Sequence, residues 1–506
     1  MEGYLLGIDI GTSSCKTVLF SVAGAVVYSA KEEYVTIYGA NGEVEQNPLD
    51  WWNALCSTTQ KVLEGSGIDP AQIRAVGLDA QSSAFIPVSA DHDLLHNALI
   101  WTDHRARAQQ QWLEEYVDPK VQISINGNRF DASNVGTKAL WWKQTHGAEY
   151  EKTAVILNAC GYIVYMLTGN DSCNISEADL SQLSDQETGT WSDVLMDAYG
   201  LDAQKFPPIF YGDEIAGTVT PAAAAATGLA PGTPVTVGAM DVCATALGSG
   251  VFCSGNAVIT GGTVTGIALC DDRFVIQNTA HVYHHMIKNR WIYCASIDFG
   301  GGSLRWFRDK FMDYIDDRED LYNLMDDMAL QIRAGSDNLI FLPYLAGQRC
   351  PEWDSNMAGV FFGLRPHHGK AHCIRAIMEG TAFGLSKIAE MFRKDGILIR
   401  KLMVAGGCAK SEVWMDIFSQ VLSQSNLYDS LSEELAALGS ALGAGLAVGV
   451  YPDVEAAVEC CQIQMMSYPE HDRIRYAKMQ QLFESLYPLL KDSFRQLKEI
   501  DDFVEA

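Results

Sequence analysis

Two copies of one glycine-rich hairpin pattern constrain this chain more than any other feature. In the first copy, residues 4–21, two apolar and β-prone stretches flank a turn of small residues that begins with Gly11-Thr12. The second copy, residues 256–269, repeats the pattern with Gly262-Thr263 in the turn. The two turns lie 251 residues apart, about half of the 506 residues, which predicts an internal duplication of a whole domain.

Strand-like and helix-like stretches alternate between and after the hairpins. Residues 74–78 and 234–239 have the apolar composition of buried strands. The alanine-rich stretches 221–227 and 435–448 are typical of helices. This alternation predicts α/β layers, so we expect an α/β fold of two duplicated domains.

A joint of small residues at 251–255 precedes the second hairpin, and we place the domain boundary there. The expected domains are therefore residues 1–252 and residues 253–506. In the tail, residues 469–506, the spacing of Leu482, Leu486, Leu489 and Leu490 predicts a packed closing helix.

Charge and cysteine content exclude several classes of partner. The 36 basic and 63 acidic residues give a net charge of −27, which argues against nucleic acid and anionic membrane surfaces as partners. Thirteen cysteines without a CxxC pair predict reduced thiols rather than disulfides or a zinc site. The start of the chain lacks the pattern of a signal peptide, and no apolar run is long enough for a membrane span. We expect a cytoplasmic protein.

The first hairpin carries residues suited to phosphate chemistry. In Gly7–Lys16, Gly11 permits close approach of the backbone to phosphate oxygens, and Thr12 and Ser13 add hydroxyl donors. Asp9 lies among apolar strand residues, where a carboxylate is costly unless it has a role such as holding Mg²⁺ through water. A plain turn with a hydrogen-bonded aspartate is the alternative. The Walker A pattern is absent from the sequence.

Three further segments fit the same chemistry. The second hairpin, Ile259–Gly266, can contact phosphates from another side. Residues Val404–Trp414 predict a strand, a tight glycine turn and a helix that starts near Ser411, which suits approach to adenine or ribose or a turn without a ligand. Asp241 follows a buried strand and precedes a helix, where it is either a helix cap or a base that accepts a hydroxyl proton.

Residues between 81 and 105 are the candidates for binding a polyol. Gln81, Ser82 and Ser83 follow a predicted strand, and Trp101, Asp103 and Arg105 are spaced by two. An indole face packs on CH groups, and a charged pair bonds to hydroxyls. An exposed ion pair beside a core tryptophan is the simpler interpretation.

Three histidines, His281, His284 and His285, raise the question of a metal site. They lie in an aromatic, strand-like run, and no nearby cysteine or aspartate in the sequence completes a ligand set. We expect a structural role for them rather than zinc binding.

Taken in order, these motifs resemble the FGGY carbohydrate kinases, a family of the actin–hexokinase–Hsp70 ATPase superfamily. The resemblance covers residues 4–451. Its carriers are the two hairpins and the following motifs: VGAMD at 237–241, LPYLAGQRCP at 342–351, GVFFGL at 359–364, TKALWWK at 137–143, YMLTG at 165–169 and GGSLRWFRD at 301–309.

The resemblance implies two actin-like ATPase domains of the ribonuclease H-like fold, with a cleft between them that closes. It implies ATP and Mg²⁺ as cofactors, Asp241 as the catalytic base, and Asp9 as the residue that positions Mg²⁺ and phosphate. The sugar would contact Gln81, Ser82, Ser83, Trp101, Asp103, Arg105 and Asp241. The nucleotide would contact Gly11, Thr12, Ser13, Lys16, Gly262, Thr263, Gly301, Arg305, Gly406, Gly407 and Ser411.

Departures from the family pattern concern the substrate. Xylulose kinases usually have Gln-Met-His-Gly where this chain has Gln81-Ser82-Ser83-Ala84, and glycerol kinases have an Arg-Glu pair that is missing here. Gln348 and Cys373 also replace residues common in the family. We expect a ketopentose such as xylulose as the substrate, with glycerol, erythritol, gluconate or a similar polyol as alternatives.

The motifs leave two other classes of function as alternatives. One is an ATPase switch of the same superfamily, which the Trp101-Asp103-Arg105 cluster disfavours. The other is a sugar-sensing regulator, which we disfavour because no basic helix-turn-helix extension precedes Gly3 or follows Val504. The sequence does not decide the oligomeric state, although family members often form dimers or tetramers, so a homo-oligomer is one expectation.

Overall fold

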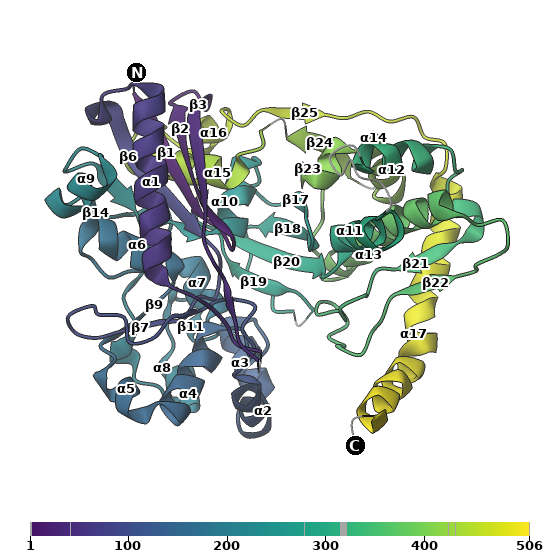
Figure 1. Ribbon diagram of the computed structural model, residues 1–506, viewed down its shortest axis with the longest axis horizontal. Coiled ribbons are helices and arrows are strands. Elements are labelled where there is room, and N and C mark those ends of the chain that lie inside the picture. Colours follow the sequence, from purple (N-terminus) through teal and green to yellow (C-terminus); the bar gives the residue numbers. More distant parts are fainter. Residues whose placement is uncertain are drawn as a thin grey trace. The chain divides into compact units, whose positions relative to one another are not determined.

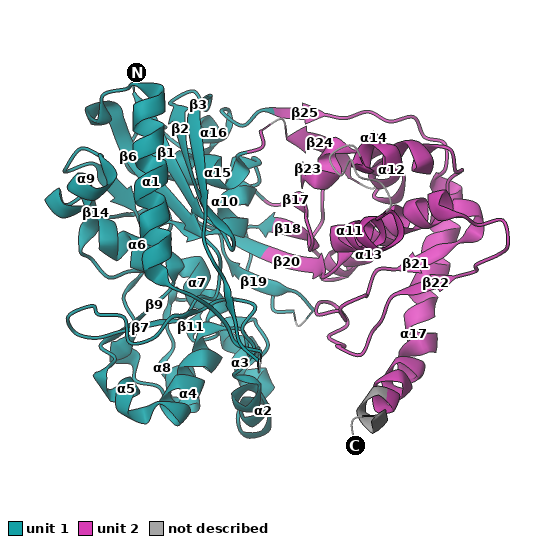
Figure 2. Cartoon of the chain, in the orientation of Figure 1, with its two compact units in different colours: residues 1–253, 270–292, 434–462 teal, residues 254–269, 293–433, 463–506 magenta. Residues whose placement is uncertain are grey.

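The structure is a computed structural model. It describes residues 3–40, 42–277, 279–313, 321–423, 425–430 and 432–504. Contacts divide the chain into two compact units, coloured separately in Figure 2. Unit 1 comprises residues 1–253, 270–292 and 434–462, and unit 2 comprises residues 254–269, 293–433 and 463–506. The later segments 270–292 and 434–462 thus group with unit 1, an interleaving that a single boundary between residues 252 and 253 does not describe.

Unit 1 is built on a mixed sheet. Its strands, in spatial order, are β14 (Ile215–Thr218), β15 (Pro234–Thr236), β6 (Ile73–Ala80), β1 (Tyr4–Ile10), β2 (Ser14–Ser21) and β3 (Val26–Glu33), with β16 (Ala239–Met240) also paired to β6. The predicted first hairpin is present, because β2 runs antiparallel to β1. Both β1 and β16 run parallel to β6, so their carboxyl ends meet at one edge of the sheet. Figure 1 shows β1 and β6 in this sheet.

One predicted strand of unit 1 is broken. Residues 234–239 form β15 and the start of β16 instead of one continuous strand. The break lies at Gly238, which has a φ of 80°, and a Cβ at this position would come within 2.5 Å of the Leu78 carbonyl oxygen. The close approach to β6 therefore requires glycine and a local change of direction.

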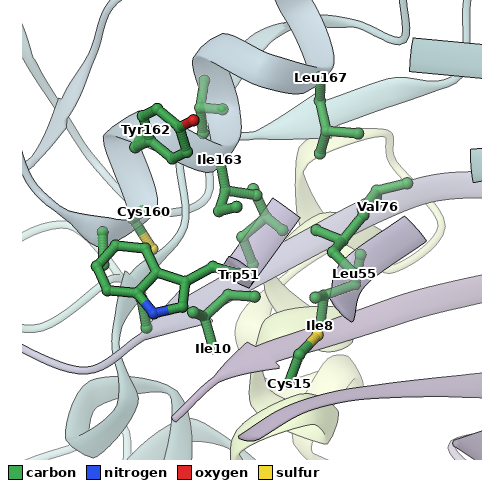
Figure 3. Packing of buried hydrophobic residues seen from close by; sticks show 14 of the residues in the cluster. Ile8, Ile10, Cys15, Trp51, Leu55, Val76, Cys160, Tyr162, Ile163 and Leu167 are labelled. Carbon is green, nitrogen blue, oxygen red and sulfur yellow. The ribbon is translucent and has the colours of Figure 1, made fainter. Parts of the chain in front are cut away.

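Helices α1 (Pro48–Ser66) and α6 (Ala159–Thr168) bury their apolar side chains against the sheet. Asn47 caps α1 by accepting the Leu49 N–H, and the helix ends at Gly67, which has a φ of 67°. Figure 3 shows Ile8 of β1 among Trp51, Leu55 and Ile163 in this core.

The opposite face of β1 and β6 receives α15 (Leu435–Ala447). A Cβ on Gly7 would lie 2.0 Å from the Ala437 carbonyl oxygen, and one on Gly77 would lie 1.9 Å from that of Ser440. The helix therefore rests directly on the strand backbone. Because side chains alternate along a strand, Asp9 and Asp79 project to this same face, two residues beyond the glycines.

The predicted helices of unit 1 are confirmed as α9 (Pro221–Thr227) and α15. Helix α10 (Asp241–Gly248) packs against α15. The other elements are η1 (Pro70–Gln72), β4 (Ile37–Tyr38), β5 (Val44–Gln46), β7 (Ile86–Val88), β8 (Ala98–Leu99), α2 (Arg107–Tyr116), α3 (Pro119–Asn126), α4 (Val135–Thr145), α5 (Gly147–Lys152), β9 (Val155–Leu157), β10 (Cys173–Asn174), α7 (Ile175–Leu180), β11 (Ser184–Asp185), β12 (Thr190–Trp191), α8 (Asp193–Tyr199), η2 (Ala203–Lys205), β13 (Ile209–Phe210), β19 (His281–His284) and α16 (Val454–Val458).

Unit 2 repeats the central arrangement of unit 1. Its strands, in spatial order, are β20 (Trp291–Ile297), β18 (Thr265–Asp271), β17 (Asn256–Gly261), β23 (Lys401–Gly406), β24 (Asn426–Ser430) and β25 (Ile463–Met465). The hairpin β17–β18 is antiparallel, and β17 runs parallel to β23 just as β1 runs parallel to β6. The predicted duplication is thus visible in the topology.

The helices of unit 2 are α11 (Gly300–Phe311), α12 (Leu321–Leu330), α13 (Lys370–Lys394), α14 (Glu412–Val421) and α17 (Arg473–Val504), with the smaller elements η3 (Ser336–Asn338), β21 (Ile340–Leu342), β22 (Val360–Phe362) and η4 (Gly407–Lys410). The predicted tail helix is α17, but its leucines pack only in part. Leu486 is buried, whereas Leu482 and Leu489 are 44% and 74% exposed. No helix in the described part of the chain combines the length and apolar character that a bilayer crossing requires.

Candidate active site

Three aspartates meet where the strands of unit 1 end. Asp9 of β1 lies opposite Asp79 of β6 in the parallel register, and Asp79 lies opposite Ala239 of β16. Asp241 follows β16 directly and opens α10. Backbone register therefore places three carboxylates, from three neighbouring strand ends, at one edge of the sheet. This edge is where open α/β sheets place their ligands.

Burial raises the pKa of all three carboxyl groups, and the charge of Asp9 adds to the rise in Asp79 and Asp241. Burial raises the pKa of Asp9 to about 6, although a hydrogen bond with Asp79 and the charge of Lys16 oppose this rise. Burial raises the pKa of Asp241 to about 7, and the charge of Asp9 adds to it. Asp79 is completely buried, and its pKa lies well above its ordinary value for the same reason. Asp9 and Asp241 retain partial exposure, so these two can meet a ligand.

Several contacts hold the turn of the first hairpin. The Thr12 carbonyl accepts a hydrogen bond from Gln46 Nε2 at 2.6 Å, and its Oγ1 accepts one from Trp101 Nε1 at 3.0 Å. The Tyr34 hydroxyl donates to the Gly11 carbonyl. Ser13 at the tip is exposed. These hydrogen bonds hold Gly11 and Thr12 in place, while Ser13 at the tip of the turn remains accessible to solvent.

Lys16 of β2 lies beside Asp9 in the hairpin register. Its ammonium group forms an ion pair with Glu434 at 2.8 Å, and both side chains are partly exposed. The lysine therefore partly compensates the negative charge at this edge of the sheet.

The segment after β6 is held by an unusually dense set of polar contacts. Gln81 Nε2 donates to Gln46 Oε1 at 2.8 Å. Ser83 has a φ of 56°, a left-handed conformation that is uncommon for a residue other than glycine. Its N–H donates to both carboxylate oxygens of Glu177 at 3.1 and 3.2 Å, and its hydroxyl donates to Asn134 Oδ1 at 3.0 Å. Ser82, which lies between Gln81 and Ser83, is partly exposed.

Asp103 and Arg105 form an ion pair inside the protein, not on its surface. Asp103 is completely buried and accepts the Val44 N–H at 2.7 Å and Arg105 Nε at 2.9 Å. Arg105 Nη2 also donates to Glu45 at 2.8 Å, and the guanidinium carbon lies 5.1 Å from the centre of the Trp141 ring. The simpler interpretation of this pair, as solvent-exposed, is wrong. Its contacts tie the loop that carries Trp101 to β5.

The glycine turns of unit 2 surround a cavity of about 540 Å³. A Cβ on Gly301 would come within 2.2 Å of the Gly262 carbonyl oxygen, and one on Gly261 would come within 2.0 Å of Cys408 Sγ. Arg305 donates a hydrogen bond to Thr263 Oγ1. The lining residues are Gly261, Gly262, Thr263, Gly301, Leu304, Arg305, Tyr322, Asn323, Asp326, Gly407, Cys408, Lys410, Ser411 and Trp414. The volume is that of a typical small-molecule site.

The predicted strand, turn and helix around Val404–Trp414 are confirmed. Strand β23 ends at Gly406, whose φ is 83°, and Ser411 caps α14 by accepting the Trp414 N–H at 3.2 Å. Gly407 and Ser411 line the cavity, whereas Gly406 does not. At Gly406 a Cβ would instead come within 2.5 Å of the Gly261 carbonyl oxygen, so this glycine keeps β23 close to β17.

The histidines have the contacts of structural residues. His284 Nδ1 bonds to Asp179 at 2.7 Å, and His285 Nε2 bonds to the Val251 carbonyl at 3.0 Å. Burial lowers the pKa of His285 to about 4, which keeps it neutral. Within the residues that the structure describes, no group of three or more His, Cys, Asp or Glu side chains is placed to hold a metal ion.

Family models account for most of the chain. Residues 4–248 match the N-terminal domain of the FGGY family of carbohydrate kinases, and residues 257–448 match its C-terminal domain. The chain belongs to this family. An FGGY kinase is a carbohydrate kinase that uses ATP, so the partner of this enzyme is a small-molecule sugar.

Named relatives of this FGGY kinase differ in their substrates. The xylulose kinase of Bacillus subtilis is 28% identical over 83% of each chain, and the gluconokinase of Bacillus licheniformis is 27% identical over 85% of this chain and 86% of its own. The crystal structure of xylulose kinase from Rhodospirillum rubrum superposes with a TM-score of 0.89 at 22% identity, over 97% of this chain and 100% of the other. It supports the two-domain, actin-like fold.

Sequence reasoning missed two buried acidic residues at the candidate site, Asp79 and Glu177. Asp79 lies in the apolar run VGLDA, and the cost of burying a carboxylate there is the same signal that identified Asp9. Glu177 stands in a short helix, α7, whose residues are all buried, and nothing in its local sequence distinguishes it. The structure brings Asp9 and Asp241 together with Asp79, and it brings Gly262, Thr263, Gly301, Arg305, Gly407 and Ser411 together around the cavity of unit 2.

Proposed function

We propose that this FGGY kinase transfers the γ-phosphoryl group of Mg-ATP to a primary hydroxyl of a small ketose, with xylulose as the first candidate. The observation that carries the proposal is Asp241, a partly exposed carboxylate at a strand end whose pKa is raised to about 7. A base with a pKa near the working pH is best suited to accept a hydroxyl proton. Gluconate, glycerol, erythritol and similar polyols are the alternative substrates.

In this proposal Asp241 orients the sugar hydroxyl and accepts its proton. As the hydroxyl oxygen bonds to the γ-phosphorus, the bond from phosphorus to the leaving ADP oxygen breaks and the proton passes to a carboxylate oxygen of Asp241. The Val242 N–H, 2.7 Å from Asp241 Oδ1, holds the carboxylate in place. Positioning supplies much of the rate acceleration in phosphoryl transfer.

Asp9 is the residue that we assign to Mg²⁺. A magnesium ion that is held by nucleotide phosphates usually keeps several waters and needs only one or two protein carboxylates. A single partly exposed aspartate beside Lys16 meets this requirement without a dedicated cluster of ligands. When bound, the ion neutralises charge on the phosphates. Gly11, Thr12, Ser13 and Lys16 complete the phosphate-binding edge in the proposal.

The cavity of unit 2 fits a nucleotide. Four of its lining residues are the glycines Gly261, Gly262, Gly301 and Gly407, and backbone without a Cβ can approach a ligand closely. Arg305 supplies positive charge, and Thr263 and Ser411 supply hydroxyl groups. We assign ADP and ATP to this cavity, with Gly406 as a support of the turn.

The sugar residues fall into two roles in the proposal. Gln81, Ser82, Ser83 and Trp101 contact the sugar, whereas Asp103 and Arg105 hold the loop that carries Trp101. Gln81 Oε1 and Asn134 Nδ2 are buried and lack a hydrogen-bond partner among the described residues. A polyhydroxylated ligand offers donors and acceptors of the kind that such groups need.

Domain roles and location follow from the same assignments. Unit 1, which includes residues 1–252, would form the sugar-binding and catalytic domain, and unit 2, which lies within residues 253–506, would form the nucleotide-binding domain. All thirteen cysteines lie in the described part of the chain as thiols, which supports work in a reducing compartment such as the cytoplasm. Homo-oligomer formation stays a prediction.

Gly301→Ala is expected to weaken nucleotide binding about 10-fold or more. The added methyl group would collide with the Gly262 carbonyl, which lies 2.2 Å from its ideal position, and would displace the turn that lines the cavity. Titration calorimetry with ADP measures the effect. Gly369→Ala is the matched control in unit 2, because a Cβ there meets no atom within 4 Å. If both variants bound ADP as tightly as the wild type, the cavity would not be the nucleotide-binding site.

The pH dependence of kcat/KM for the sugar is expected to report Asp241. The carboxyl group must be ionised to accept a proton, so kcat/KM should fall about tenfold per pH unit below about pH 7 and level off above pH 8. An aspartate with its ordinary pKa would shift this fall to about pH 4. A rate that stays constant from pH 8 to pH 5 would contradict the assignment of the base.

A coupled ADP-release assay tests the proposed function itself. The assay uses Mg-ATP with ketopentoses, pentitols, hexuloses, glycerol, erythritol and gluconate, and the expected result is a sugar-dependent signal that is largest for a ketopentose. ADP release at the same rate without any sugar would instead favour an ATPase switch.

A further inference from the structure

Glu177 is a buried carboxylate to which the proposed reaction assigns no role. It lies on the first turn of α7, is 3% exposed, and accepts the Ser83 N–H with both of its oxygens. Burial raises its pKa to about 8, and the charge of Asp241 contributes to this rise. A carboxylate is expensive to bury, so its retention here calls for a specific task.

The other contacts of Ser83 converge on the same backbone conformation. Lys138 is completely buried and its Nζ donates to the carbonyls of Ser83 at 2.8 Å and Ile100 at 2.9 Å. Glu177 thus holds the N–H of Ser83, and Lys138 holds its carbonyl. The left-handed conformation is unfavourable for a residue with a Cβ, so it persists only where the surroundings impose it.

The same turn of α7 also holds the catalytic strand end. Ser176, next to Glu177, accepts the Met240 N–H at 3.2 Å, and Met240 immediately precedes Asp241. Adjacent residues of one helix turn therefore fix both the Ser83 segment and the segment of the proposed base.

We propose that Glu177 is a positioning residue for the sugar: it locks Ser83 in its left-handed conformation, so that residues 81–83 present their polar groups at a fixed distance from Asp241. The inference rests on the proposed function, because it assumes that residues 81–83 contact the sugar. Lys138 supports the lock from the carbonyl side. Neither Glu177 nor Lys138 touches the reacting atoms.

A double-mutant cycle tests the inference. Glu177→Ala is expected to raise KM for the sugar about 10-fold while KM for ATP changes less than about twofold, because Ser83 without its acceptor leaves the left-handed region. In the Ser83→Gly background the same substitution should raise KM for the sugar less than about threefold, because glycine needs no lock. Glu177→Gln keeps one acceptor oxygen, so its KM for the sugar should lie between those of the wild type and Glu177→Ala. This variant replaces Glu177→Ala in the test if the alanine variant does not fold.

Glu379→Gln is the matched control. Glu379 in unit 2 is also buried, accepts the Gly335 N–H and the Ser336 hydroxyl at 2.8 Å each, and supports Ser336 with a φ of 46°. The Glu379→Gln substitution should lower the melting temperature without changing KM for the sugar. Suppose that the wild type phosphorylates a sugar and that Glu177→Ala, or Glu177→Gln in its place, leaves KM for that sugar unchanged. This result would overturn the inference and leave the proposed function intact. A wild type that phosphorylates no sugar would overturn both.

Discussion

Asp241→Asn is expected to lower kcat for sugar phosphorylation on the order of 1,000-fold while nucleotide affinity stays within about threefold of the wild type. The amide has nearly the shape of the carboxylate but cannot accept the hydroxyl proton. The nucleotide cavity is lined entirely by residues of unit 2, so a change in α10 of unit 1 leaves its walls intact. Steady-state kinetics and ADP calorimetry measure the two quantities.

The same substitution is expected to stabilise the fold at alkaline pH. The Asp241 carboxyl binds its proton more tightly in the folded state, with a pKa of about 7 against an ordinary 3.8, so the folded state loses stability as pH rises from about 4 to 7. Roughly three pKa units at about 1.4 kcal/mol each set an upper limit of about 4 kcal/mol for this cost. The asparagine variant avoids it, so its melting temperature should exceed that of the wild type at pH 8 and by less at pH 5.

Asp213→Asn separates catalysis from burial. Asp213 is another carboxyl group of unit 1 whose pKa burial raises, to about 6, and the charges that act on it are those of Lys288 and Glu214, not those of the three strand-end aspartates. The Asp213→Asn variant should be more stable than the wild type at pH 8, as Asp241→Asn is, and should keep wild-type kinase activity. If Asp241→Asn retained more than about a tenth of wild-type kcat, the assignment of the base would be wrong.

Gly77→Ala is expected to destabilise unit 1 by about 3 kcal/mol and to lower the unfolding midpoint by roughly 5–10 °C. The new Cβ would lie 1.9 Å from the Ser440 carbonyl oxygen, and this is helix backbone that cannot rotate away as a side chain can. Helix α15 would have to lift from β1 and β6. Thermal unfolding followed by circular dichroism measures the change.

This displacement should also reach the aspartates. The Ser440 hydroxyl donates to Asp79 Oδ2 at 2.7 Å, and Asp79 lies opposite Asp9 in the register of β6 and β1. Movement of α15 therefore pulls on the carboxylate that we assign to Mg²⁺, and the Gly77→Ala variant should need more Mg²⁺ for half-maximal activity.

Gly147→Ala is the control for this effect. Gly147 is the first residue of α5, and a Cβ there meets no atom within 4 Å. Alanine favours the helix, so the variant should be as stable as the wild type or up to about 1 kcal/mol more stable. Equal midpoints for Gly77→Ala and Gly147→Ala would show that α15 does not rest on the strand backbone.

Much of the fold could be predicted because its signals are local. The hairpin turns, the alanine-rich helices 221–227 and 435–448, and the glycine turn before Ser411 each depend on a few adjacent residues. The break at Gly238 was not predicted, because it depends on how closely that backbone approaches Leu78 on another strand. Likewise, Leu489 is exposed because the buried face of α17 runs through Phe483, Leu486 and Phe494, and only the packing partners of the helix decide which face that is.

The candidate site was predictable only in part for the same reason. Asp9 and Asp241 stand out because a carboxylate at a buried strand end is costly, and Asp79 meets the same criterion. The spacing of Asp103 and Arg105 could not show that the pair lies inside the protein, since Val44 and Glu45, which complete it, are about 60 residues away.

By itself the sequence determined the duplicated α/β plan, the two glycine hairpins and the family, because strand and turn preferences act over a few residues and motifs keep their order along the chain. Only the tertiary structure decided which carboxylates are neighbours, which of them are exposed, and that Glu177 and Lys138 hold Ser83 from both sides. These properties depend on strand register and burial, which arise when segments more than 90 residues apart, such as Ser83 and Glu177, pack together.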